Sequence, residues 1–294
     1  MPAIAIPGQE NPAKYINGKP HTNPNSLTEL WDETVQNLAS PDYIDISVNG
    51  WIEDIKPLGP AETKEIWPGG TIRELPLEPV TMFIKSTNAG DLQPLQLTYL
   101  DEEKRYRKSI FILQGTTPVE LPPIYRILDA ENVSGAGTDA YLESFGVTSQ
   151  VSGPTLGEVS IYSDGGTGDF SDPKTQAGWS NEFTAGGNST GIAMEKAFLS
   201  STTVPRGYQG YAFHFESSIG KSDEVFFAMQ TRTSTGEWVT RIPYVTFQSD
   251  IQRDILPRVL LELMDTRILA FEIGSIPLVP VAFSYQVLLL KSQE

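Results

Sequence analysis

The sequence predicts a mainly β protein with two tandem, jelly-roll-like β-sandwich domains, preceded by an extended N-terminal arm and one short helix. Three observations lead to this fold class. Val, Ile, Thr, Phe and Tyr, which favour strands, are spread along the whole chain. Runs of about 5–10 residues with strand character alternate with turn residues. The length of 294 residues exceeds that of most single domains, which favours two.

The first predicted segment, residues 1–40, is an arm followed by a helix. Five prolines within residues 1–25 disfavour regular structure and favour extended backbone. Its apolar residues indicate packing along a neighbouring surface, although a free tail is the alternative. Ser26 and Glu29 then form a capping box ahead of apolar residues at helical spacing, which predicts a helix over residues 27–38.

The second segment, residues 41–118, is predicted to be a small β domain. Residues 43–48 and 51–55 have strand character on either side of the turn dipeptide Asn49-Gly50, which predicts a β-hairpin. The further strands expected in this domain cover residues 80–86, 95–100 and 108–114.

The third segment, residues 119–294, is predicted to be a larger β-sandwich that begins after a proline-rich break at residues 118–123. Residues 153–191 are rich in Gly, Ser and Asp and are expected to be largely loop. Within this stretch, Trp179 and Phe183 either anchor the loop or present a contact surface. The expected strands cover residues 124–128, 159–162, 192–199, 210–215, 224–231, 237–246, 259–263, 268–273 and 281–290.

Charge and composition exclude several classes of partner. The 37 acidic and 21 basic residues give a formal net charge of −16, which repels nucleic acid and anionic lipid. The absence of cysteine excludes disulfides and thiolate metal sites. The N-terminal sequence lacks the pattern of a secretory signal, and the apolar run at residues 276–290 is too short and too interrupted for a membrane span. Synthesis in the cytoplasm, without a membrane partner, is therefore expected.

Several residue clusters contain the residue types used in catalysis or metal binding, but none supports a catalytic, cofactor-binding or metal-binding prediction. His21 and His214 have no companion motif for catalysis. The acidic glycine loop from Asp164 to Asp172 offers oxygen ligands of the kind that Ca²⁺ prefers, but its spacing fits no standard calcium loop, and a solvated turn is favoured. The adjacent carboxylates Asp101, Glu102 and Glu103 cannot face each other across a substrate.

One set of motifs resembles a known group of proteins. The segment Thr203-Val204-Pro205-Arg206-Gly207 ends a predicted strand with a glycine turn, and Gly220-Lys221-Ser222-Asp223 and Thr231-Arg232-Thr233-Ser234-Thr235-Gly236 follow it. Ile66-Trp67-Pro68-Gly69-Gly70 lies ahead of the strand expected at residues 80–86 of the small domain. Together these motifs resemble β-sandwich structural proteins of tailed bacteriophages, over residues 66–290. The resemblance implies a virion component, such as a capsid-decorating, head-fibre, neck or tail accessory protein.

We therefore expect a non-enzymatic protein of the virion that assembles with copies of itself and with other capsid or tail proteins. A receptor- or glycan-binding module of the virion is the alternative, with exposed aromatic side chains such as Trp179, Phe183 or Trp238 as stacking platforms for host-surface glycan. An enzyme would need a carboxylate pair that only the fold could bring together.

Overall fold

A computed structural model describes most of the chain, which forms two compact units, Met1–Ile44 and Asp45–Glu294. In the first unit, strands β1 (Tyr15–Ile16) and β2 (Lys19–Pro20) form a short antiparallel pair. The helix predicted over residues 27–38 lies outside the described residues. The structure describes residues 15–16, 19–20, 43–55, 63–134, 139–146, 153–179, 196–220, 224–233, 236–247, 251–253, 258–272 and 279–292.

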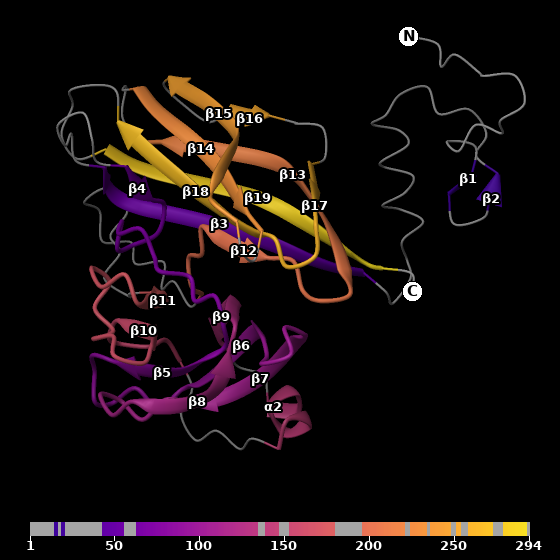
Figure 1. Ribbon diagram of the computed structural model, residues 1–294. Coiled ribbons are helices and arrows are strands. Elements are labelled where there is room, and N and C mark those ends of the chain that lie inside the picture. Colours follow the sequence, from indigo (N-terminus) through magenta and orange to yellow (C-terminus); the bar gives the residue numbers. More distant parts are fainter. Residues whose placement is uncertain are drawn as a thin grey trace, which may run out of the picture. The chain divides into compact units, whose positions relative to one another are not determined.

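The second unit is mainly β with antiparallel sheets, as predicted (Figure 1). One group of strands forms a four-stranded sheet in the order β11-β10-β5-β8 and a three-stranded sheet in the order β7-β6-β9. The helix among the described residues, α2 (Asp139–Ser144), follows β9. The strands are β5 (Val80–Ser86), β6 (Pro94–Leu100), β7 (Tyr106–Ile112), β8 (Val119–Ile124), β9 (Arg126–Asn132), β10 (Val159–Ser163) and β11 (Thr175–Trp179).

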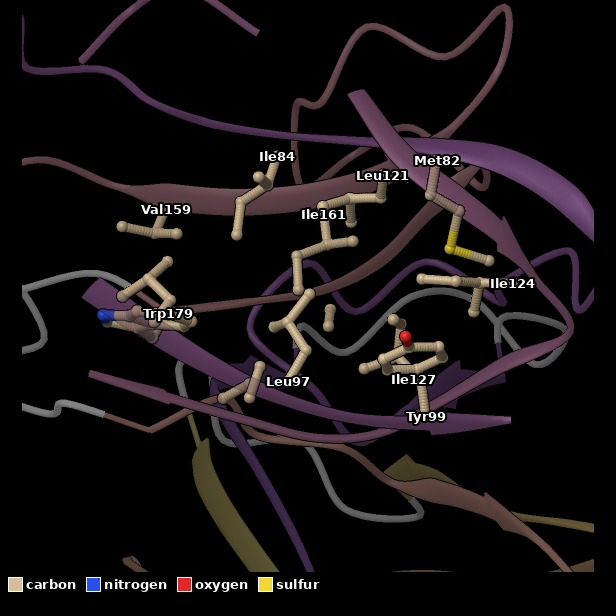
Figure 2. Close-up of a cluster of buried hydrophobic side chains, with 14 of the residues drawn as sticks. Met82, Ile84, Leu97, Tyr99, Leu121, Ile124, Ile127, Val159, Ile161 and Trp179 are labelled. Carbon is tan, nitrogen blue, oxygen red and sulfur yellow. The ribbon is translucent and has the colours of Figure 1, made fainter. Parts of the chain in front are cut away.

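A single cluster of buried apolar side chains joins these two sheets (Figure 2). Met82 and Ile84 contribute from β5, and Leu97 from β6. They alternate along each strand because successive side chains of a strand point to opposite faces. Burying each such side chain stabilises the fold by about 1.5–3 kcal/mol. Trp179, the last residue of β11, belongs to the same cluster and is fully buried.

The remaining strands form a second group, which consists of two five-stranded sheets. In one, the order is β12-β18-β14-β15, with β4 also paired to β18; in the other it is β16-β13-β19-β3, with β17 also paired to β13. The bounds are β3 (Tyr43–Ile55), β4 (Lys64–Glu65), β12 (Ser201–Thr203), β13 (Tyr208–Ile219), β14 (Glu224–Arg232), β15 (Val239–Phe247), β16 (Ile251–Arg253), β17 (Arg258–Leu260), β18 (Asp265–Glu272) and β19 (Val279–Lys291).

An aromatic cluster joins these two sheets. Phe215 of β13 stacks on Tyr285 of β19 with ring centroids 5.5 Å apart, and Phe227 of β14 lies 5.7 Å from Phe283 of β19. The Tyr285 hydroxyl hydrogen-bonds the Thr266 hydroxyl of β18 at 2.6 Å. Burial raises the pKa of Tyr285 well above its ordinary value, so this hydroxyl stays protonated in the folded protein.

The structure corrects the predicted hairpin at Asn49-Gly50. β3 runs through this dipeptide as one strand of 13 residues, Tyr43–Ile55. Ile46, Val48 and Ile52 are buried, so the two-residue period continues without a turn. A Cβ on Gly50 would lie 2.3 Å from the Ile66 carbonyl oxygen, so glycine is needed there for close approach and not for a turn.

The proline-rich break and the predicted loop also differ from expectation. Pro122 and Pro123 lie inside β8, which is an edge strand and can therefore tolerate prolines that lack an N–H donor. The stretch 153–191 contains β10 and also β11, so in its described part, residues 153–179, the predicted loop is interrupted by two strands, and the sequence did not predict β11. The strand predicted at residues 192–199 is absent from its described end: Lys196 forms an isolated bridge with Glu131, and residues 197–199 are irregular.

Sheet pairing crosses residue 118, where the sequence suggested a domain boundary. β5 pairs with β8, and β6 pairs with β9, so strands on either side of residue 118 share both sheets of the first group. β3 lies beside β19 in the other group, although 43–55 falls in the predicted small domain. In chain order, β3 and β4 therefore belong to the two five-stranded sheets, β5 to β11 form the other two sheets, and β12 to β19 belong to the five-stranded sheets again.

Glycine at position 69 is required by a close backbone contact. A Cβ on Gly69 would lie 1.9 Å from the Phe170 carbonyl oxygen, and Trp67 beside it is fully buried. We expect Gly69→Ala to lower the free energy of unfolding by about 1–3 kcal/mol, because backbone must move to admit the methyl group. Urea denaturation measures the change. Gly90→Ala, where the added Cβ would lie 3.2 Å from the flexible Asn88 Oδ1, is the control, and equal effects of the two would contradict the expectation.

Candidate functional site

The acidic glycine loop forms a turn whose carboxylate and carbonyl oxygens accept hydrogen bonds from within the loop and from Lys85 of β5. The Asp172 carboxylate accepts hydrogen bonds from the backbone N–H groups of Thr167 at 2.6 Å and Lys174 at 2.9 Å. These backbone hydrogen bonds lower the pKa of Asp172. The Lys174 ammonium donates to the Asp164 carbonyl oxygen, and the Lys85 ammonium to the Thr167 carbonyl oxygen. Within the described ranges, no group of three or more acidic or histidine side chains is arranged to hold a metal ion.

The carboxylates at 101–103 likewise serve a turn. Asp101 accepts hydrogen bonds from the backbone N–H groups of Glu103 and Arg105, and it pairs with the Arg107 guanidinium at 2.7 Å. Although partial burial acts to raise it, these hydrogen bonds and the two arginine charges lower the pKa of Asp101. Of the two histidines, His214 lies in β13, with its side chain outside the described part of the structure, and His21 lies outside the described residues.

The three aromatic residues proposed as stacking platforms have different environments. Trp179 is fully buried, and its indole N–H donates to the Thr155 hydroxyl at 3.1 Å, so it anchors the chain to the core and cannot stack on a ligand. Phe183 lies outside the described residues. Trp238 is half-buried and is contacted by two arginines: the Arg232 and Arg267 guanidinium carbons lie 4.6 and 3.9 Å from its ring centroid.

These two arginines belong to a larger cluster that we call the arginine network, which consists of Arg73, Arg126, Arg232, Arg267, Glu65 and Asp265. Asp265, at the start of β18, is its centre and is fully buried. Arg126 at the start of β9 binds both Asp265 oxygens, at 3.0 and 2.9 Å. Arg232 at the end of β14 binds Asp265 Oδ2 at 2.7 Å, and the Thr203 hydroxyl donates to Oδ1 at 2.6 Å.

The ionisation of Asp265 follows from these contacts. Burial alone would raise the pKa of this carboxyl, but the Arg126 charge and the hydrogen bonds from Arg126, Thr203 and Arg232 outweigh it and lower the pKa. Asp265 is therefore a carboxylate at neutral pH. Because β9 belongs to the first group of strands and β14 and β18 to the second, the ion pairs of Asp265 with Arg126 and Arg232 connect the two groups.

A second buried ion pair lies beside the first. Arg73 and Glu65 pair through their side chains, with side-chain exposures of 0% and 1%. Arg73 also donates to the Gln176 carbonyl oxygen of β11 and to the Ser200 and Ser201 hydroxyls. Its guanidinium carbon lies 5.1 Å from the Trp67 ring centroid. This pair therefore connects the Trp67 turn with both groups of strands.

The glycine turn that carries the phage resemblance also contacts both groups. Gly207 has a φ of +80°, which a glycine adopts without strain. The Val204 N–H donates to the Met264 carbonyl oxygen within the second group, and the Arg206 N–H donates to the Lys104 carbonyl oxygen of the β6–β7 turn. The turn is thus hydrogen-bonded to both groups of strands.

Sequence reasoning missed the arginine network because its members do not form a local motif. Arg126 and Asp265 are 139 residues apart. One feature of the sequence could have indicated the network: Arg232, in the Thr231-Arg232-Thr233 motif, ends a strand whose central residues are mostly apolar. A charged residue in such a strand requires a partner, because an unpaired buried charge is strongly unfavourable.

Comparisons with known proteins leave the family open. No protein-family model matches the chain, and no curated protein sequence matches it. A search of solved structures returned, among others, vicilin from Capsicum annuum (9% identity, 90% of this chain and 80% of that chain, TM-score 0.16). Others are an oxalate decarboxylase from Bacillus subtilis (11%, 87% and 67%, TM-score 0.13) and the VP2 subviral particle of infectious bursal disease virus (8%, 85% and 72%, TM-score 0.18). TM-scores this low do not establish a shared fold.

Proposed function

We propose that this chain is a non-enzymatic structural protein of a bacteriophage virion, a capsid-decorating, neck or tail accessory component that acts through protein–protein assembly. The observation that carries the proposal is the arginine network, in which buried charged groups join sheets to each other. A building block that bears load in a particle needs such fixed geometry. The phage-like turn at residues 203–207 supports the same proposal, because it holds the same junction.

The finer architecture belongs to this proposal. We infer two β-sandwiches, nested and not tandem, in which the sandwich of β5 to β11 is inserted between β3 and β12. In the assembled particle, residues 1–40 contact a neighbour, and the sandwiches pack with other copies and with capsid or tail proteins. The protein is located in the virion.

Light scattering on the full-length chain and on a chain lacking residues 1–25 tests the assembly. We expect a discrete oligomer for the full-length chain and a loss of that oligomer after the deletion, because the proposed arm binds the surface of a neighbouring copy and so holds the copies together. In particles of the phage that encodes the chain, quantitative mass spectrometry should find a fixed copy number relative to the capsid protein. Absence from purified particles would contradict the virion role.

The second candidate is a receptor- or glycan-binding module of the virion. Trp238 favours it, because this indole is half-buried and not enclosed in a core. Binding to a panel of host-surface glycans should then persist after deletion of residues 1–25 and be lost in Trp238→Ala. Trp179 has no part in this candidate, since its ring is fully buried.

A further inference from the structure

Arg267 is a partly buried cation without a carboxylate hydrogen-bond partner. Its Nε and one Nη donate to the Gln230 Oε1 of β14, at 2.9 and 2.8 Å, and the structure gives it no ion pair among the described residues. Burial, together with the nearby charges of Arg232 and Arg73, lowers the pKa of Arg267 in spite of the opposing charge of Glu65. A neutral amide oxygen therefore takes the place that a carboxylate fills for the other arginines of the network.

The arginine network as a whole is cationic. Four guanidinium groups face two carboxylates, Glu65 and Asp265, which leaves two positive charges in excess. Arg73 and Arg126 satisfy the two carboxylates from the buried side, at side-chain exposures of 0% and 3%. Arg232 shares the Asp265 carboxylate with Arg126, and Arg267 has no carboxylate of its own, so the least neutralised side of the network is the one where Arg232 and Arg267 contact the half-buried Trp238.

We propose that Arg267, Arg232 and Trp238 form a carboxylate-binding site for an acidic peptide segment, supplied by a second copy of this chain. The guanidinium fork of Arg267 has donors beyond the two that Gln230 uses, and its geometry matches a carboxylate. Trp238 provides the apolar wall beside it, and its contact with both cations holds them in place. An incoming carboxylate also offsets the repulsion between Arg232 and Arg267.

Charge complementarity identifies the partner. The chain carries 37 acidic against 21 basic residues, so the surface of another copy offers carboxylates far more often than cations. Two copies with a net charge of −16 repel each other, and a cationic site is what permits approach in one orientation. The choice of partner rests on the proposed assembly function, whereas the carboxylate site itself does not.

The test measures binding of a fluorescein-labelled hexaglutamate peptide to the full-length protein by fluorescence anisotropy. Arg267→Gln should raise the dissociation constant of the peptide about tenfold or more, because it removes a charge-assisted hydrogen bond. Arg267→Lys should restore only part of the affinity, since an ammonium lacks the planar fork. Added NaCl should weaken binding to the wild type. Arg107→Gln, on an exposed arginine of β7, is the matched control and should leave binding unchanged.

Circular dichroism and the thermal midpoint of each variant establish that it is folded. Failure of hexaglutamate to bind the wild type, or equal binding to Arg267→Gln, overturns the site. Binding of an oligogalacturonate through Arg267 without binding of the peptide overturns the peptide class.

Light scattering on the same variants separates the site from the assembly function. Loss of the oligomer in Arg267→Gln supports the second copy as the source of the carboxylate. An oligomer that is unchanged while peptide binding is lost overturns that source. A wild-type monomer that binds hexaglutamate through Arg267 supports the carboxylate site and counts against self-assembly.

Discussion

Replacing Asp265 by alanine is expected to lower the free energy of unfolding by about 3–5 kcal/mol, because it leaves the buried Arg126 and the nearly buried Arg232 without their carboxylate. The Thr203 hydroxyl loses its acceptor in the same change. In a protein of this size such a loss lowers the thermal midpoint by on the order of 10 °C. Differential scanning calorimetry or urea denaturation of the full-length chain measures it.

Two comparisons isolate the charge of Asp265. Asp265→Asn keeps the shape but removes the charge, and it should also be strongly destabilising. Asp164→Ala, on an exposed turn, should change the free energy of unfolding by no more than about 0.5 kcal/mol. A thermal midpoint of Asp265→Ala equal to that of Asp164→Ala would contradict the role of the network.

The same carboxylate predicts a dependence on pH. The pKa of Asp265 is lowered in the folded state, so its contribution to stability is present above the unfolded pKa, about 3.9. That contribution is lost as the pH falls through the lower, folded-state pKa. The wild type should therefore lose more stability than Asp265→Asn below about pH 4. Parallel pH curves for the two proteins would show that Asp265 does not titrate as the contacts require.

Replacing Trp179 by alanine is expected to have the second large effect, a loss of about 3–5 kcal/mol in the free energy of unfolding. The indole is fully buried at the end of β11, packs in the cluster of Figure 2, and donates to the Thr155 hydroxyl. Its removal leaves a cavity between the two sheets and an unpartnered hydroxyl. Urea denaturation measures the loss, and Trp179→Phe should recover part of it.

Leu156→Ala provides the control for Trp179, because Leu156 lies in the same stretch of chain but is 62% exposed. Its substitution should leave stability within about 0.5 kcal/mol of the wild type. Loss of glycan binding in Trp179→Ala at unchanged stability would favour the stacking role that burial argues against.

Periodicity predicted most strands correctly, because the burial of alternate side chains is a local property. β5, β10 and β14 lie within one residue of the ranges expected from their apolar alternation. Glycine was the residue type that misled the prediction. Gly50 and Gly178 lie inside strands, where a Cβ would collide with a neighbouring carbonyl oxygen, at 2.3 and 2.5 Å. Sequence alone does not distinguish a glycine needed for a turn from one needed for close packing.

The candidate site was less predictable than the strands. Ion pairs such as Arg126 with Asp265 depend on which strands become neighbours, and no local pattern encodes that order. Trp238 was expected to be exposed, and the structure shows it half-buried against two arginines. Its two arginine neighbours come from β14 and β18, which the sequence did not place side by side.

The position of β3 beside β19 has a consequence during synthesis on the ribosome. β3 ends at Ile55, and its partner begins at Val279, so the strand emerges long before the chain that completes its sheet. At about 5–20 residues per second this wait is roughly 10–50 s. The strands from β5 to β11 have their partners nearby in sequence and can close first. β3 therefore remains an unpaired edge in the nascent chain, open to chaperones and to pairing with other copies at the time when newly made chains are most crowded.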